Sequence, residues 1–359
     1  MKKLKNIMLG ILIFATISIV VVCSIYNYNL KPPKNSKDLI EIEIPNGSSV
    51  KKVASILKSN NLIRSEKIFV IYTKIMNKSN LKSGIYKVSY NTGVKKLVDT
   101  LEKGSTYNPE EVVITFKEGK TMRDIAKVIE ANTNNSYDSV IEKSNDIEYI
   151  DSLIEKYWFI TEDVKQDGIY YKLEGYLFPD TYAFKNKDVS VEEIFNKMIA
   201  EMAKKLEPYK KEINKSDLSV HEMLTLASMV EKESYDSMED KKNVASVFMN
   251  RIKVGMSLGS DVTTLYANKI DGSRAMYTHE LQLKSPYNTR LTDGSMNGKL
   301  PIGPISTISI KSLEAAIEPN ETDYLFFIAN IKTKETFFYQ YSSDFEKKKV
   351  ELKDVNRGM

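Results

Sequence analysis

The most regular hydrophobic pattern in the chain is an apolar run near its N-terminus. Residues 7–25 carry no charge, and three lysines lie in the six residues before them. This length is about what a helix needs to cross a bilayer, whereas a cleaved signal peptide has a shorter apolar core and a small-residue cleavage site. We therefore expect a cytoplasmic N-terminus over residues 1–6, a single transmembrane helix over residues 7–29, and the bulk of the chain outside the cell membrane.

A strand–turn–helix pattern occurs twice after this span. In residues 42–57, and again in residues 113–129, a short apolar strand leads to a glycine and then to a serine or threonine placed to cap an amphipathic helix. A shorter copy covers residues 84–97. The pattern resembles a LysM module, which binds N-acetylglucosamine chains. A purely structural strand–helix unit needs the same turn and cap, so both interpretations stay open.

These patterns divide the chain into segments. Residues 30–40, with two adjacent prolines, are typical of a stiffened linker. We expect further segments in this order: a LysM-like membrane-proximal subdomain (41–110), a second strand–helix unit with a helical connector (111–215), a domain with the candidate catalytic residues (216–350) and a tail (351–359). The C-terminal part should contain a helix at 312–316 and a hairpin of strands 323–329 and 336–339.

Within the connector, residues 173–182 combine aromatic side chains with acidic ones. Sugar rings stack on aromatic faces, and carboxylates accept hydrogen bonds from sugar hydroxyl groups. Glu174 and Tyr176 are therefore candidate carbohydrate-binding residues. The alternative is that this segment is an apolar loop packed beneath a domain.

Two predicted apolar helices further along the chain carry the strongest candidate catalytic residues. The first has apolar positions at helical spacing over residues 223–230 and then reaches Glu231, Lys232 and Glu233, and the second covers residues 244–252. A carboxylic acid where a buried stripe meets a polar edge can have the raised pKa that acid catalysis requires. Helices also often end in solvated charges. At about 100° per residue, Glu231 and Glu233 flank the stripe alike, so periodicity does not choose between them.

The loops after these helices are polar and rich in turns. Residues 260–263 offer hydrogen-bonding side chains, and residues 285–289 and 300–305 form rigid turns of the kind that often hold functional residues. Residues 255–259 match the G-x-S-x-G pattern of a serine hydrolase. That motif requires a strand before the serine, whereas a helix precedes Ser257, so we interpret the match as accidental.

The composition excludes several classes of function. The chain has 52 basic and 48 acidic residues, a balance too even for a nucleic-acid-binding face. It has two histidines and one cysteine, which argues against a zinc site and excludes a disulfide within the chain. We therefore expect no metal, no cofactor and no nucleic acid. The 42% hydrophobic content allows a packed core.

Several short motifs occur in a fixed order along the chain: E-G-Y-L-F-P-D-T-Y, A-S-M-V-E-K-E-S, V-F-M-N-R, G-S-D-V-T, S-P-Y-N-T, L-P-I-G-P-I, S-L-E-A-A and T-D-Y-L-F-F. In this order they resemble the MltG (YceG-like) endolytic murein transglycosylases over nearly the whole chain. The resemblance implies an α+β fold with one N-terminal span, a LysM-like subdomain and a mixed α/β catalytic domain. It also implies an enzyme that cuts nascent peptidoglycan glycan strands internally and leaves 1,6-anhydro-muramyl ends.

The resemblance further implies roles for individual residues. It places the catalytic acid, later the base, at Glu233 and leaves Glu231 solvated or in a structural ion pair. Arg251 is expected to be structural, as a helix-end cation that bridges to a carboxylate. The side chains expected to bind substrate, besides Glu174 and Tyr176, are those of Asn250, Ser260, Asp261, Thr263, Ser285, Tyr287 and Asn288. The expected partners are peptidoglycan glycan strands and the peptidoglycan synthases of the elongation machinery.

The chain departs from this family pattern at several points. Val262 and Ile302 stand where proline is usual, Arg290 stands at a usual aromatic position, and the loop up to residue 299 is longer than usual. The longer loop could alter substrate length preference or partner contacts. Three other functions stay open: a hydrolytic muramidase with the same acid, a non-catalytic glycan-binding scaffold for wall synthesis, and a serine hydrolase at Ser257.

Overall fold

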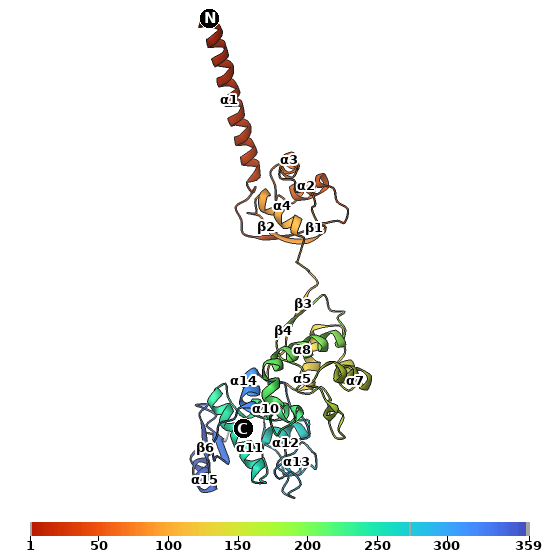
Figure 1. Ribbon diagram of the computed structural model, residues 1–359, viewed down its shortest axis with the longest axis vertical. Coiled ribbons are helices and arrows are strands. Elements are labelled where there is room, and N and C mark those ends of the chain that lie inside the picture. Colours follow the sequence, from red (N-terminus) through yellow and green to blue (C-terminus); the bar gives the residue numbers. More distant parts are fainter. Residues whose placement is uncertain (1, 273, 357–359) are drawn as a thin grey trace. The chain divides into compact units, whose positions relative to one another are not determined.

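The apolar run near the N-terminus forms one long helix. In the computed structural model, which describes residues 2–272 and 274–356, helix α1 covers Lys2–Leu30 (Figure 1). The segment Leu4–Leu30 of this helix is long enough and apolar enough to cross a membrane. Residue 1 and the end of the expected tail, residues 357–359, lie outside the described residues.

The chain forms two compact units, of which the first covers residues 1–110. After α1 its elements are β1 (Leu39–Ile44), α2 (Val50–Ser59), α3 (Glu66–Ile75), β2 (Gly84–Ser89) and α4 (Val94–Lys103). The two strands pair in antiparallel register, with Ile42 opposite Tyr86. These two side chains alternate with exposed ones and face a core that the helices cover. Ser49 caps α2 as its sequence position predicts, and Ser65 caps α3.

The second unit, residues 111–359, opens with a second small sheet and a helical layer. Strands β3 (Val112–Thr115) and β4 (Thr181–Phe184) pair in antiparallel register. The intervening and following elements are α5 (Met122–Asn132), α6 (Tyr137–Ser144), α7 (Ile147–Lys156), the 3₁₀ turns η1 (Glu162–Lys165) and η2 (Glu207–Tyr209), α8 (Val191–Leu206) and α9 (Lys210–Ile213). Thr121 and Asp124 form a capping box that starts α5, so the second strand–turn–helix copy has the local structure that its sequence predicts.

The remaining elements of this unit build the part of the molecule that carries the candidate chemistry. They are α10 (Val220–Glu233), α11 (Met238–Lys253), α12 (Asp261–Ala267), α13 (Thr278–Leu281), α14 (Ile310–Ile317), β5 (Phe326–Ala329), β6 (Thr336–Tyr339) and α15 (Ser342–Glu351). Helices α10, α11 and α14 pack against one another, and the antiparallel β5–β6 hairpin confirms the hairpin expected near the C-terminus. The mixture of helices and small sheets, with one N-terminal apolar helix, confirms the α+β class. The likeness of the first unit to a LysM module stays a prediction.

A close backbone contact fixes the aromatic segment of residues 173–182 against the 300–305 turn. Gly175 has φ +79°, and a Cβ at this position would lie 2.3 Å from the Cβ of Pro304. Only glycine fits such a position without displacing the turn. This contact brings together two motifs that are far apart in the sequence.

Candidate active site

Glu233 is the last residue of α10, where that helix leaves the core. Ser219 and Glu222 form a capping box that starts the helix, and residues 223–230 are buried. Glu233 itself is only partly buried, so its carboxyl group reaches a cavity from a rigid support. The C-terminal end of a helix carries partial negative charge, which disfavours the ionised form of a carboxyl group placed there.

The surroundings of Glu233 hold its carboxyl group in place and shift its pKa. The hydroxyl group of Ser260 donates a hydrogen bond to Oε1 of Glu233 at 2.5 Å. Burial raises the pKa of Glu233 above its ordinary value, and the nearby charge of Asp261 acts in the same direction. The Ser260 hydrogen bond and the Arg290 guanidinium group act in the opposite direction, but the net shift is upward. A raised pKa keeps more of the acid protonated near neutral pH, as a proton donor requires.

Two threonines hold Ser260 in its position. The backbone N–H of Ser260 donates to Oγ1 of Thr289 at 3.1 Å, and Thr263 donates to the Ser260 carbonyl at 2.8 Å. The hydroxyl groups of Thr263 and Thr289 are themselves 2.8 Å apart. Thr263 was expected to bind substrate, but its hydroxyl group is fully buried and committed to this network. Thr289 was not singled out from the sequence, although it lies in the S-P-Y-N-T motif.

Asp261 lies beside the acid, at the start of α12. Its carboxylate pairs with the guanidinium group of Arg290, and the two side chains are 60% and 40% exposed. Arg290 also donates to the Gly259 carbonyl at 3.1 Å. In the sequence Arg290 stands out only as a departure from the family pattern, because its partner lies 29 positions away in the chain.

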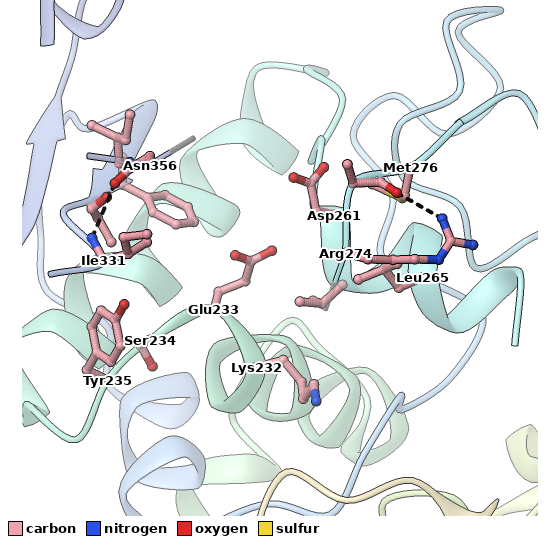
Figure 2. A pocket seen from close by; sticks show the side chains of 15 residues that line it. Lys232, Glu233, Ser234, Tyr235, Asp261, Leu265, Arg274, Met276, Ile331 and Asn356 are labelled. Atoms are coloured by element: carbon pink, nitrogen blue, oxygen red, sulfur yellow. Dashed lines mark hydrogen bonds between the residues drawn. The ribbon is translucent and has the colours of Figure 1, made fainter. Parts of the chain in front are cut away.

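Glu233 stands where two cavities meet. One has a volume of about 530 Å³ and the other about 510 Å³, and both are lined by Glu233, Asp261, Phe327 and Ile328. Figure 2 shows the carboxyl group of Glu233 in the first cavity, with Asp261, Leu265 and Arg274 on one side and Ile331 and Asn356 on the other. The second cavity continues past Ser260 and is also lined by Arg251, Met256, Arg290 and Phe345. Each volume is within the usual range for a ligand site, so a chain-like ligand has room on both sides of the acid.

The C-terminal hairpin supplies a wall of both cavities. Phe327 and Ile328 of β5 contribute to each, and Asn356 lines the first one. Asn356 lies in the segment expected to be a tail, and its side chain donates to the Ala329 carbonyl at 2.9 Å. Sequence reasoning missed these residues because apolar strand positions look the same whether they line a cavity or a core.

Glu231 has a different environment from Glu233. Its Oε2 accepts hydrogen bonds from the hydroxyl groups of Ser309 at 2.6 Å and Ser312 at 2.5 Å, and it lies 3.4 Å from Nζ of Lys241. The side chains of Glu231 and Lys241 are only 11% and 4% exposed. Glu231 is therefore the structural ion-pair member of the two alternatives left open for it, and it links α10, α11 and α14.

Several residues expected to bind substrate instead hold the protein together. The Asn250 amide donates to the carbonyls of Thr322 at 2.7 Å and Tyr324 at 3.0 Å, which anchors the approach to β5. The Asn288 amide is fully buried and donates to the carbonyls of Leu281 and Leu283. Neither asparagine is among the described residues that line the two cavities.

Ser285 and Tyr287 lie in an aromatic cluster rather than at the acid. The ring of Tyr287 is fully buried, 4.8 Å from the rings of both Tyr170 and Tyr266, and Ser285 lies 3.2 Å from the Tyr170 hydroxyl group. Aromatic rings at such separations stabilise a core. These two side chains therefore support the loop that carries Thr289 rather than contacting the cavity around Glu233.

Glu174 and Tyr176 are also buried. The Tyr176 hydroxyl group lies 2.6 Å from Nδ1 of His221, whose Nε2 is 2.8 Å from the Ile302 carbonyl. Glu174 accepts hydrogen bonds from the backbone N–H of Met122 and the hydroxyl group of Tyr266. The observed geometry therefore matches the alternative interpretation of the 173–182 segment, a loop packed beneath a domain.

Arg251 is structural, but its partners differ from the expected ones. It donates to the carbonyls of Leu325 and Leu258, each at 2.6 Å, and does not bridge to a carboxylate among the described residues. Burial lowers its pKa to about 10, and the charge of Glu233 opposes that shift. Carbonyls replace the expected carboxylate because the helix end meets a strand and a loop at this point.

Glu174 should make stability depend on pH. Burial raises its pKa to about 7 from 4.5, so the folded state keeps a proton that the unfolded state loses between these values. Stability from this group is thus fully present below about pH 4.5 and is lost as the pH rises through 7. Between pH 5 and pH 8 the wild type should lose on the order of 3 kcal/mol relative to Glu174→Gln. Urea unfolding followed by fluorescence of the single tryptophan, Trp158, measures this difference. Equal pH dependence in the two proteins would contradict the assignment.

The charges around Glu233 should move the pH profile of any reaction that needs it protonated. Asp261→Asn removes a charge that raises the pKa of Glu233, so the alkaline limb should move to lower pH. Arg290→Gln removes a charge that lowers this pKa, so the limb should move to higher pH. Rates measured from pH 5 to pH 9 test the opposite signs. Lys299→Gln, a change at an exposed lysine outside the two cavities, serves as the control and should leave the limb in place. Shifts of equal sign in the two variants would show that neither charge acts on the acid.

Comparison with known proteins places this site in a family. The sequence profile of the YceG-like family matches residues 42–351, which include every residue of the site described above except Asn356. The chain belongs to the YceG-like family. A relative from Bacillus subtilis, named an endolytic murein transglycosylase, is 39% identical over 308 residues, which cover 85% of this chain and 83% of that protein.

Two further proteins are similar to this chain over most of its length. A protein of the same name from Streptococcus pneumoniae (strain D39) is 32% identical over 331 residues, and the match spans 88% of this chain but only 59% of that longer protein. The crystal structure of a YceG-like protein from Listeria monocytogenes superposes with a TM-score of 0.61 at 37% identity, over 87% of this chain and 99% of that one. The YceG-like fold therefore extends over most of the chain.

Proposed function

We propose that this YceG-like protein is an endolytic murein transglycosylase whose acid, and then base, is Glu233. The observation that carries the proposal is the position of Glu233 at the junction of two cavities, with its carboxyl group oriented by Ser260. Room on both sides of the acid suits internal cleavage, because sugar units must bind on each side of the bond that breaks. The relatives that carry this enzyme name support the same proposal.

The bond that breaks lies between N-acetylmuramic acid and N-acetylglucosamine. The reaction uses two proton transfers, one from Glu233 and one back to it. Glu233 first donates its proton to the glycosidic oxygen as the bond from C1 of the muramyl sugar to that oxygen breaks. The 6-hydroxyl oxygen of the same muramyl sugar then bonds to C1 and returns its proton to Glu233. The product is a 1,6-anhydro-muramyl end, and one carboxyl group suffices because no water has to be activated. Ser260 holds the carboxyl group, and Asp261 and Arg290 contact the sugars from the edge of the cavities.

The proposal includes a membrane anchor and a glycan-binding first unit. In this proposal helix α1 spans the cell membrane once, with its N-terminus in the cytoplasm. The order β1–α2–α3–β2 with an antiparallel sheet supports the LysM-like interpretation, in which the unit binds the glycan strand. Peptidoglycan synthases of the elongation machinery are the proposed protein partners.

A hydrolytic muramidase is the second candidate. The observation that favours it is that a second carboxylate, that of Asp261, lines the same cavities as Glu233, and most glycosidases use two. The pairing of Asp261 with Arg290 argues against it, because a carboxylate held by a guanidinium group is a weaker base. The two candidates differ in the chemical form of the new end.

The experiment is to incubate the full-length protein in lipid vesicles with uncrosslinked glycan strands and to identify the products by mass spectrometry. Internal fragments that end in 1,6-anhydro-muramic acid are the expected result. Reducing ends instead would establish hydrolysis. A complete absence of cleavage under conditions in which glycan strands bind would favour the scaffold alternative.

A further inference from the structure

The position of the membrane surface along α1 follows from the length of its apolar run. Residues 7–25 as a helix measure roughly 28 Å, about the thickness of the hydrocarbon core of a bilayer. Tyr26 and Tyr28 come directly after this run, at the depth where tyrosine is enriched in membrane proteins. The last turn of α1 therefore lies at the membrane surface.

That last turn is packed against the first unit rather than leading into a free linker. Leu30 is buried in the core of the unit, and Tyr26 packs against that core. The guanidinium group of Arg64 lies 4.3 Å from the ring centre of Tyr28 and donates to its hydroxyl group at 2.8 Å. Arg64 also donates to the Pro32 carbonyl at 2.9 Å, so it ties the start of α3 to both the helix and the predicted linker.

Helix α3 packs against α1, and α3 lies beside the end of α1 in Figure 1. Its outer face combines two exposed isoleucines with two exposed lysines. Ile71 and Ile75 are 43% and 67% exposed and lie one turn apart, and Lys67 and Lys74 lie on the same side, within an arc of about 100°. This arc contains no acidic residue, because the single acid of α3, Glu66, lies about 80° beyond its edge.

We propose that this face of α3 rests on a membrane surface that contains anionic phospholipids. In this arrangement Ile71 and Ile75 insert among the lipid headgroups, while Lys67 and Lys74 bind the lipid phosphates. Amphipathic helices bind membranes in this way when apolar side chains are flanked by basic ones. The contact is continuous with α1, which already enters the bilayer beside it, so the unit stays fixed on the membrane. This inference rests on the proposed membrane anchor.

The test measures the depth of single labels in the full-length protein. Cys23→Ser removes the only cysteine, and Ile75→Cys then carries an environment-sensitive fluorophore in nanodiscs that contain anionic lipid. The control is Glu43→Cys, an exposed position of β1 on the sheet face opposite the helices. Phe14→Cys, in the middle of α1, reports separately whether the anchor spans the bilayer.

We expect the label at position 75 to emit at shorter wavelength and to be quenched several-fold more by lipids with spin-labelled headgroups than the label at position 43. Anionic lipid should increase this quenching, and Lys67→Glu/Lys74→Glu should abolish the increase. Equal quenching at positions 75 and 43 overturns the proposal. A shorter emission wavelength without lipid quenching also overturns it, because the face is then covered by protein, such as a second copy of the chain. If position 14 is not quenched by lipids labelled in the acyl chain, the anchor itself is wrong.

Discussion

Replacing Glu233 with glutamine is expected to slow glycan cleavage by about 10²- to 10⁴-fold, the range by which a positioned acid or base accelerates a reaction. Glutamine has the same shape, and its side-chain oxygen can still accept the Ser260 hydrogen bond, but it cannot donate a proton to the glycosidic oxygen. The loss should therefore appear in the rate of the chemical step and not in folding. The measurement is the rate at which anhydro-muramyl fragments form from uncrosslinked glycan strands.

Two controls make this result specific. The unfolding free energy of Glu233→Gln, followed by Trp158 fluorescence, should stay close to that of the wild type, because a partly buried carboxyl group with a raised pKa is replaced by a neutral group. Binding of glycan strands should also persist. If the variant cleaves as fast as the wild type, then Glu233 is not the acid, and either another group acts or the reaction is not of this type.

The buried ion pair between Lys241 and Glu231 should make a large contribution to the free energy of unfolding. Lys241→Met leaves the carboxylate of Glu231 buried without its counter-charge, and breaking a buried pair in this way costs about 3–5 kcal/mol. The expected result is a fall of that size in the unfolding free energy from urea titration. The double variant Glu231→Gln/Lys241→Met should be more stable than the sum of the single changes predicts, because it leaves no buried charge.

The neighbouring lysine provides a matched control for this change. Lys242 lies 3.8 Å from Glu318, whose side chain is 73% exposed, so this pair is screened by water. Lys242→Met should change stability by no more than about 1 kcal/mol. If Lys241→Met has an equally small effect, Glu231 is not a structural hub, and the distinction between the two glutamates of α10 fails.

The local elements could be predicted from the sequence because their signals are local. The apolar run of α1, the serine and threonine caps of α2 and α5, and the apolar strands of the C-terminal hairpin each involve residues within a few positions of one another. The ordered motifs also indicated the family. These signals depend on periodicity and capping, which hold in any tertiary context that buries one face of the element.

The roles of the polar side chains in the loops could not be predicted from such local signals. Thr263, Asn288 and Glu174 have the residue types that bind sugars, and the sequence offered no reason to separate them from Ser260 and Asp261. In the folded protein the first three are buried, so each must satisfy its hydrogen bonds internally. Only Ser260 and Asp261 line a cavity with the acid.

The sequence by itself determined that the chain has an N-terminal apolar span, strand–helix units after it, and a helix that ends in two glutamates. It could not choose between those glutamates from the pattern, because both flank the apolar stripe of α10. Only the tertiary structure decided their environments: α11 and α14 bring Lys241 and two serines to Glu231, whereas the loop before α12 and the β5–β6 hairpin place Glu233 between two cavities. The physical reason is that burial and pairing of a charge depend on residues distant in sequence, which helical periodicity does not report.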